Sequence, residues 1–80
     1  VDVRTVIGRN VRAARKKLGE SQASFSERCG FSQQYLSGLE RGRRNPTAIS
    51  LWEIAEALGV PVYQLLVDHP DESWLSAPKG

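Results

Sequence analysis

Amide, hydroxyl and guanidinium side chains are concentrated between positions 33 and 45 of the chain. Gln33, Gln34 and Ser37 carry groups that donate and accept hydrogen bonds, and a glutamine amide matches the N6 and N7 edge of adenine. A loop follows whose guanidinium groups suit phosphate oxygens. Its polar residues are Arg41, Arg43, Arg44 and Asn45. These residue types indicate recognition of base edges beside a phosphate strand, and the alternative is a solvated helix face followed by a solvated loop.

A short helix has to present the glutamines, and a glycine marks the turn before it. Gly30 supplies the positive φ that a tight turn between two short helices needs. We expect Ser21 to cap the helix before this turn, and Ser32 to cap the helix after it, which should run to about Arg41. The inward positions of the first of these helices are expected to be Ala23, Phe25 and Cys29. This pattern is typical of a helix-turn-helix.

On a wheel of about 100° per residue, the helix after Gly30 has two arcs of different character. The core arc holds Tyr35, Leu36 and Leu39. The opposite arc holds Gln33, Gln34, Ser37, Gly38 and Arg41. Because this second arc has no bulky apolar side chain, we expect it to fit a major groove.

Three further helices are expected to complete an all-α domain. The first repeats apolar residues at intervals of four, three and four, which predicts an inward stripe of Ile7, Val11, Ala14 and Leu18. The fourth should be capped by Thr47 and bury Leu51, Ile54, Ala55 and Leu58 before Gly59 ends it. A short fifth helix after Pro61 should close the core with Val62, Leu65 and Leu66.

Charge is distributed unevenly along the chain. Residues 1–44 hold ten Lys or Arg and four Asp or Glu, a net charge of +6, whereas residues 45–80 hold one Lys and five acids, a net charge of −4. Arg9, Arg12 and Lys16 lie opposite the apolar stripe of the first helix. We expect Arg12 and Lys17 to add phosphate contacts. The asymmetry predicts that one end of the molecule faces a polyanion.

Composition argues against several other functions. The 80 residues suit a single domain, and no apolar run approaches the roughly 20 residues of a membrane span, so we expect a cytoplasmic protein without membrane contact. Cys29 is the only cysteine, so we expect no internal disulfide and no metal site. His69 is the only histidine and has no nucleophile beside it. We therefore expect neither an enzyme nor a cofactor.

Several short motifs carry a family resemblance. They are LG at 18–19, SQ at 21–22, GFS at 30–32, YLSGLERGRRNP at 35–46 and IAEALGVP at 54–61. From Ile7 to about Leu66 the chain resembles the Cro and phage-repressor group of helix-turn-helix regulators, the XRE family. The resemblance implies a compact five-helix, lambda-repressor-like fold in which the third helix reads the major groove of double-stranded DNA.

The resemblance also implies roles for individual residues. Base-facing positions fall on Gln33, Gln34 and Ser37, and an ion pair is implied between Arg15 and Glu40. The phosphate-contacting set that we expect comprises Gln22, Ser32, Arg41, Arg43, Arg44, Asn45, Arg12 and Lys17. Departures from the family pattern occur at Glu20, Ser24, Ser26 and Gly38. Gly38 stands where some relatives place a base-reading side chain, so specificity is expected to depend more on DNA shape.

We expect a prokaryotic or phage transcriptional regulator, most simply a repressor, that binds an inverted repeat as a homodimer. Ile49, Trp52 and Tyr63 are the candidate dimer surface, and scattered exposed apolar residues are the alternative. RNA polymerase or another protein is a conceivable partner. The competing hypothesis is an antitoxin or coactivator-like interaction module with secondary DNA binding.

One domain boundary is expected, between residues 68 and 69. Residues 1–68 should form the DNA-binding domain and residues 69–80 an extended tail, in which Trp74 and Leu75 could dock on the domain or on a partner. Because position 1 is Val and not Met, we expect the chain to be a piece of a longer gene product.

Overall fold

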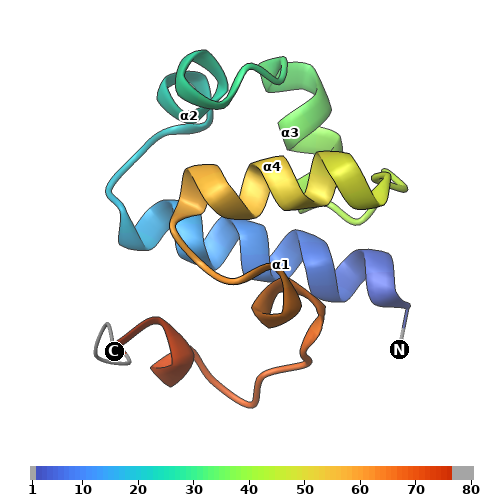
Figure 1. Ribbon diagram of the computed structural model, residues 1–80, viewed down its shortest axis with the longest axis vertical. Coiled ribbons are helices and arrows are strands. Elements are labelled where there is room, and N and C mark those ends of the chain that lie inside the picture. The colour runs from blue at the N-terminus through green and yellow to red at the C-terminus, as the bar shows by residue number, and fades with distance from the viewer. Residues whose placement is uncertain (1, 77–80) are drawn as a thin grey trace.

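The computed structural model describes residues 2–76, and every regular element within that range is helical (Figure 1). The α-helices are α1 (Val3–Lys17), α2 (Gln22–Cys29), α3 (Gln33–Glu40) and α4 (Ala48–Leu58). Two short 3-10 helices follow, η1 (Val62–Leu66) and η2 (Ser73–Ser76). The all-α class predicted from the sequence is therefore confirmed.

The short fifth helix expected after Pro61 forms as the 3-10 helix η1 at Val62–Leu66, so the described residues contain four α-helices and not five. The amide of Gln64 donates to the carbonyl of Pro61 over 3.0 Å, a bond between residues three apart. The side-chain amide of Asn10 on α1 then donates to the carbonyls of Leu65 at 2.9 Å and Val67 at 2.8 Å. These bonds tie the end of η1 to α1.

Capping residues place the ends of the helices as the sequence predicts. The hydroxyls of Ser21, Ser32 and Thr47 each accept a hydrogen bond of 3.0 Å from the amide three residues on. Gly30 and Gly59 end α2 and α4 in the left-handed conformation, with φ of 83° and 74°. These local interactions explain why the boundaries could be read from the sequence.

Helix α1 lies at the centre of the fold and contacts α3, α4 and η1 (Figure 1). Each of the first five elements contributes at least one fully buried side chain to a single core. These side chains are Val11, Phe25, Leu36, Leu39, Ile54 and Leu65. Cys29 is half-buried and packs against this core. Burial of this shared apolar surface stabilises the short helices, which would be marginal alone.

Three residues that the periodicity assigned to the core are exposed instead. Leu18 is 49% exposed because it follows the last residue of α1, where the chain turns away at Gly19. Leu66 is 48% exposed at the end of η1, where the 3-10 geometry directs Leu65 inward instead. Ala23 is exposed in the first turn of α2, a helix of two turns that buries only Phe25.

Asn10 is a buried polar residue that joins α1 to the end of the fold. It is 3% exposed, and its amide nitrogen donates to the carbonyls of Gln64, Leu65 and Val67. Asn10→Ala should leave the carbonyl of Leu65 without its side-chain donor, while the carbonyls of Gln64 and Val67 keep their contacts with His69. We expect this change to lower the free energy of unfolding by about 1 to 3 kcal/mol. Urea denaturation followed by circular dichroism measures this change.

Arg9→Ala is the matched control for Asn10→Ala. Arg9 is the neighbouring residue, and its guanidinium pairs with Asp68 on the same C-terminal segment, but both side chains are more than half exposed. An exposed pair of this kind contributes about 0 to 1 kcal/mol. Equal losses in the two variants would contradict a structural role for the Asn10 amide.

Candidate nucleic-acid interface

Two hydrogen bonds stabilise the turn between α2 and α3. The hydroxyl of Ser26 donates to the carbonyl of Phe31 over 2.5 Å, and the amide of Gly30 donates to the carbonyl of Ser26 over 3.1 Å. Ser32 then caps α3. The serine at position 26, a departure from the family pattern, thus joins α2 to the turn that precedes α3.

Helix α3 presents the predicted polar residues outward. Gln33 and Gln34 are exposed, Ser37 is half-buried, and Leu36 and Leu39 lie in the core. Within residues 2–76, the side chains of Gln33 and Gln34 form no hydrogen bond to the protein. Their amide groups are therefore available to an external partner. We call this surface, formed by Gln33, Gln34 and Ser37, the reading face.

Gly38 was expected on the polar, solvent-facing arc of α3, and the structure places it differently. It is buried, because the side chain of Arg44 lies over it. The wheel could not predict this arrangement, since Arg44 belongs to the loop that follows α3.

A buried cluster beneath α3 fixes its position relative to α1 and α2. The Glu40 side chain is 3% exposed and accepts from Arg15 Nε at 2.7 Å, from Arg15 Nη2 at 2.9 Å and from Gln22 Nε2 at 3.1 Å. Arg15 Nη1 also donates to the carbonyl of Glu20 over 2.7 Å. Hydrogen bonding to Glu40 raises the pKa of Arg15. The structure thus brings Arg15, Gln22 and Glu40 together in one network that joins three helices.

The loop after α3 is folded back onto the helix by a left-handed glycine. Gly42 has φ of 74°, its amide donates to the carbonyl of Leu39 over 3.0 Å, and the amide of Arg43 donates to the carbonyl of Gly38 over 2.9 Å. This pair of bonds is a Schellman motif. Arg43, Arg44 and Asn45 follow it as exposed residues next to the reading face.

The remaining residues of the expected phosphate set lie in different surroundings. Arg41 is exposed and its Nε donates to the carbonyl of Ser37 over 3.3 Å. Arg12 is exposed on α1. Lys17 lines a groove to which neither α3 nor the arginine loop contributes, so the structure does not bring Lys17 to the reading face.

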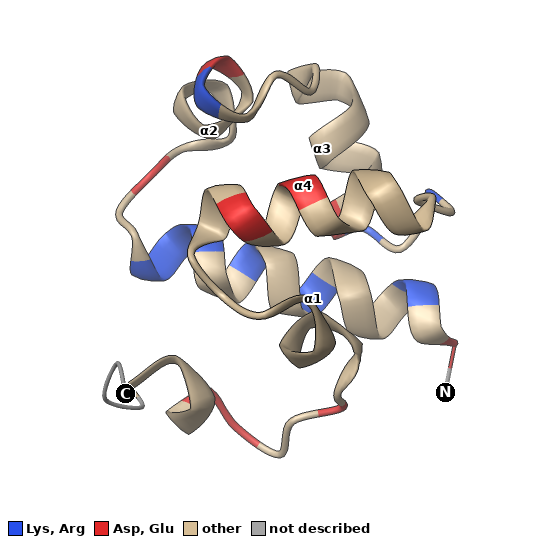
Figure 2. Cartoon of the chain, viewed as in Figure 1, with Lys and Arg blue, Asp and Glu red and all other residues tan. Residues whose placement is uncertain are grey.

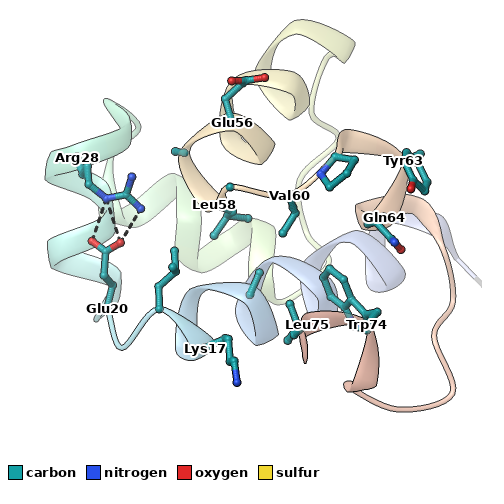
Figure 3. Close-up of a pocket in the computed structure, with 15 residues that line it drawn as sticks. Lys17, Glu20, Arg28, Glu56, Leu58, Val60, Tyr63, Gln64, Trp74 and Leu75 are labelled. Carbon is teal, nitrogen blue, oxygen red and sulfur yellow. Dashed lines mark hydrogen bonds and ion pairs between the residues drawn. The ribbon is translucent and has the colours of Figure 1, made fainter. Parts of the chain in front are cut away.

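That groove has a volume of about 950 Å³ and is bordered by the C-terminal segment (Figure 3). Glu20 and Arg28 form one side of it, Trp74 and Leu75 the other, and Leu58 and Val60 lie between them (Figure 3). The Trp74 ring stacks on His69 at 4.4 Å between centroids, and Trp74 and Leu75 pack against the core. Of the two docking sites that the sequence left open for Trp74 and Leu75, the structure shows the one on this domain.

Glu20, which departs from the family pattern, has polar partners. Its carboxylate pairs with Arg28 Nη2 at 2.6 Å and accepts from the hydroxyl of Ser24 at 3.1 Å. The hydrogen bond from Arg28 lowers the pKa of Glu20. Ser24 is another residue that departs from the family pattern, so these two replacements interact with one another.

The candidate dimer residues are all exposed. Ile49 is 74% exposed, Trp52 56% and Tyr63 61%. Trp52 and Tyr63 border one hollow of about 280 Å³ between α4 and η1. The structure therefore brings two of the three residues together on a surface that involves neither α2 nor α3.

Basic and acidic residues lie mainly on different elements of the fold (Figure 2). Lys and Arg are found along α1 and in the loop after α3, whereas acidic residues lie on α4 and the C-terminal segment (Figure 2).

Within residues 2–76, no group of three or more His, Cys, Asp or Glu is placed to bind a metal ion. None of the helices described has the length and apolar character to cross a bilayer.

Sequence reasoning missed two contacts of polar residues, one in the scaffold and one at the reading face. Asn10 interrupts the apolar stripe of α1 between Ile7 and Val11, and that interruption was the available signal for a buried hydrogen-bonding residue. The contact of Arg44 with Gly38 had no signal in the spacing of residues, because it depends on how the loop returns.

Comparisons with known proteins agree with this geometry. Residues 11–65, more than half of the chain, match the helix-turn-helix family HTH_3. The chain is 52% identical over 66 residues to the uncharacterized HTH-type transcriptional regulator y4dJ of Sinorhizobium fredii, covering 82% of this chain and 86% of that protein. It is 36% identical over 56 residues to the immunity repressor protein of Bacillus phage phi105, covering 70% of this chain and 39% of the repressor.

A solved structure shows the same fold. The crystal structure of the hypothetical transcription factor NHTF from Neisseria superposes with a TM-score of 0.80 at 37% identity, covering 94% of this chain and 84% of that one. With the helix-turn-helix and its outward-facing glutamines already described, these matches show that the chain belongs to the HTH_3, or XRE, family of helix-turn-helix DNA-binding transcriptional regulators.

Proposed function

We propose that the protein is a prokaryotic or phage repressor that binds an inverted-repeat DNA operator as a homodimer. The observation that carries the proposal is the reading face, where two unpartnered glutamines project from a helix held by the buried Arg15–Glu40 pair. A rigidly held helix loses little conformational freedom on binding, which favours sequence discrimination. The similarity to the immunity repressor protein of Bacillus phage phi105 supports repression as the sign of regulation.

Phosphate contacts are assigned to residues that surround the reading face. Arg41, Arg43 and Asn45 are exposed in or beside the loop, and Ser32 can donate its hydroxyl proton while its oxygen caps α3. Gln22, which lies at the first position of α2, has a second amide proton available beside its bond to Glu40. Arg12 adds a cation on α1.

Dimerisation is assigned to the surface of Ile49, Trp52 and Tyr63. A two-fold dimer presents the same patch from each subunit, and two half-sites about 34 Å apart bring both recognition helices to one side of the duplex. Large exposed apolar side chains gain most from such burial. The interaction-module alternative has less support, since the relatives carry the names of transcription regulators.

Selection from a random duplex library, followed by fluorescence anisotropy on the enriched sequence, tests the proposal. Enrichment of an inverted repeat, bound with two chains per duplex, is the expected result. Selection of no sequence, together with recovery of a stoichiometric protein partner, would instead support the interaction module.

Gln33→Ala and Arg43→Ala should differ in the kind of binding that they lose. Gln33→Ala should cost about 1 to 3 kcal/mol on the preferred operator and change the preferred base, because it removes a bidentate contact. Arg43→Ala should weaken binding to all sequences and reduce the slope of log K against log salt by about 0.9. Anisotropy titrations over a salt series measure both, and wild-type behaviour of both variants would show that the docking face is assigned wrongly.

Trp52→Ser should shift the protein toward monomer and weaken operator binding while leaving the fold intact. Trp52 is 56% exposed, so its loss removes little of the core. Sedimentation velocity measures the oligomeric state. Glu53→Ser, at the neighbouring exposed position on α4, is the matched control. A dimer that persists unchanged in Trp52→Ser would place the interface elsewhere.

A further inference from the structure

The side chain of Arg44 occupies the space where α3 lacks a side chain. A Cβ atom on Gly38 would lie 2.9 Å from Arg44 Nε, 3.2 Å from Cγ and 3.5 Å from Cδ. The first two distances are too short for an undisturbed contact, so the arginine fits there because residue 38 is glycine.

Two features hold Arg44 in this position. The Schellman motif at Gly42 turns the chain back along α3. The Arg44 guanidinium carbon then lies 5.4 Å from the centroid of the Tyr35 ring, which stacks on Phe31 at 5.3 Å. A guanidinium over an aromatic face at this distance is attracted to the ring. Arg44 is thus positioned before any ligand arrives.

The guanidinium of Arg44 also remains available for binding. Within residues 2–76 it takes part in no ion pair and no hydrogen bond, and the residue is exposed. Gln34 and Gly38 are four residues apart on α3 and so are neighbours on one side of the helix. The arginine lying over Gly38 therefore extends the reading face beside Gln34.

We propose that Arg44 is a base-reading residue that contacts a guanine in the major groove, in place of the side chain that α3 lacks at Gly38. The fork of a guanidinium matches the O6 and N7 acceptors of guanine, and the position of Arg44 over Gly38 places this fork on the side of α3 that carries Gln34. The proposal rests on the proposed function, because it assumes that α3 lies in the major groove. It replaces the phosphate role that the sequence predicts for Arg44.

The first test compares Arg44→Ala with Arg43→Ala on the selected operator and on duplexes with each base pair changed singly. Arg44→Ala should abolish the preference for one G·C pair in each half-site, a loss of about 5- to 150-fold in discrimination there, and keep the others. Arg43→Ala, the adjacent arginine without the ring contact, should weaken all duplexes by a similar factor.

Gly38→Ala provides the second test, because it displaces Arg44 without removing its charge. Alanine favours the helix more than glycine does, so α3 should form, and thermal unfolding verifies this. Discrimination at the same G·C pair should fall as in Arg44→Ala, while the salt dependence of binding should stay that of the wild type.

The outcomes separate this proposal from the proposed function. Uniform weakening by Arg44→Ala, with every base preference retained, would assign Arg44 to a phosphate and overturn the inference alone. Wild-type discrimination in Gly38→Ala would also overturn it. A wild-type protein that selects no sequence would overturn the proposed function, and the role of Arg44 with it.

Discussion

Glu40→Ala is expected to lower the free energy of unfolding by about 3 to 5 kcal/mol. The Glu40 side chain is 3% exposed and the Arg15 side chain 9%, so removing the carboxylate leaves a buried guanidinium without its counter-charge. The amide of Gln22 loses the same acceptor. Because small domains are stable by only about 5 to 15 kcal/mol, such a loss removes a large share of the total stability.

Urea denaturation followed by circular dichroism measures this loss against two controls. Arg28→Ala breaks the pair with Glu20, in which the arginine is 46% exposed, and should cost at most about 1 kcal/mol. The double variant Arg15→Met with Glu40→Leu should be more stable than Glu40→Ala, because no charge is left unpaired. Equal midpoints for Glu40→Ala and Arg28→Ala would contradict the structural role of the buried pair.

Gly8→Val is expected to cost more than about 3 kcal/mol, because α1 and α3 approach one another at this residue. A Cβ on Gly8 would lie 2.4 Å from the carbonyl oxygen of Leu39 and 2.8 Å from that of Glu40. Both are backbone atoms, which cannot rotate away as a side chain could. The two helices would have to separate, and the Arg15–Glu40 pair and the reading face would move with them.

Gly19→Ala is the matched control for Gly8→Val. Gly19 has φ of 76° but no atom within 4 Å of the position of a Cβ, so its replacement introduces backbone strain without a collision. That strain costs about 1 to 2 kcal/mol. Thermal unfolding of both variants, with operator binding measured on the folded fraction, tests the difference. A Gly8→Val protein as stable as Gly19→Ala would show that the helices do not depend on this contact.

Local chemistry made much of the helical framework predictable from the sequence. Ser21, Ser32 and Thr47 cap helices in the structure as they were expected to. Gly30 forms the turn because it alone in that stretch readily adopts positive φ. The outward position of Gln33 and Gln34 followed from the same helical period that buries Leu36 and Leu39. Each of these features depends on residues a few positions apart.

The sequence by itself therefore determined the all-α class, the helix-turn-helix and the identity of the outward-facing glutamines. Only the tertiary structure decided that Val62–Leu66 is a 3-10 helix, that Leu18 is exposed and that Arg44 fills the space over Gly38. Caps, turns and periodicity act within one or two helical turns, so the local sequence specifies them. Contacts between distant segments, such as Asn10 with the carbonyls of η1, depend on how the helices pack.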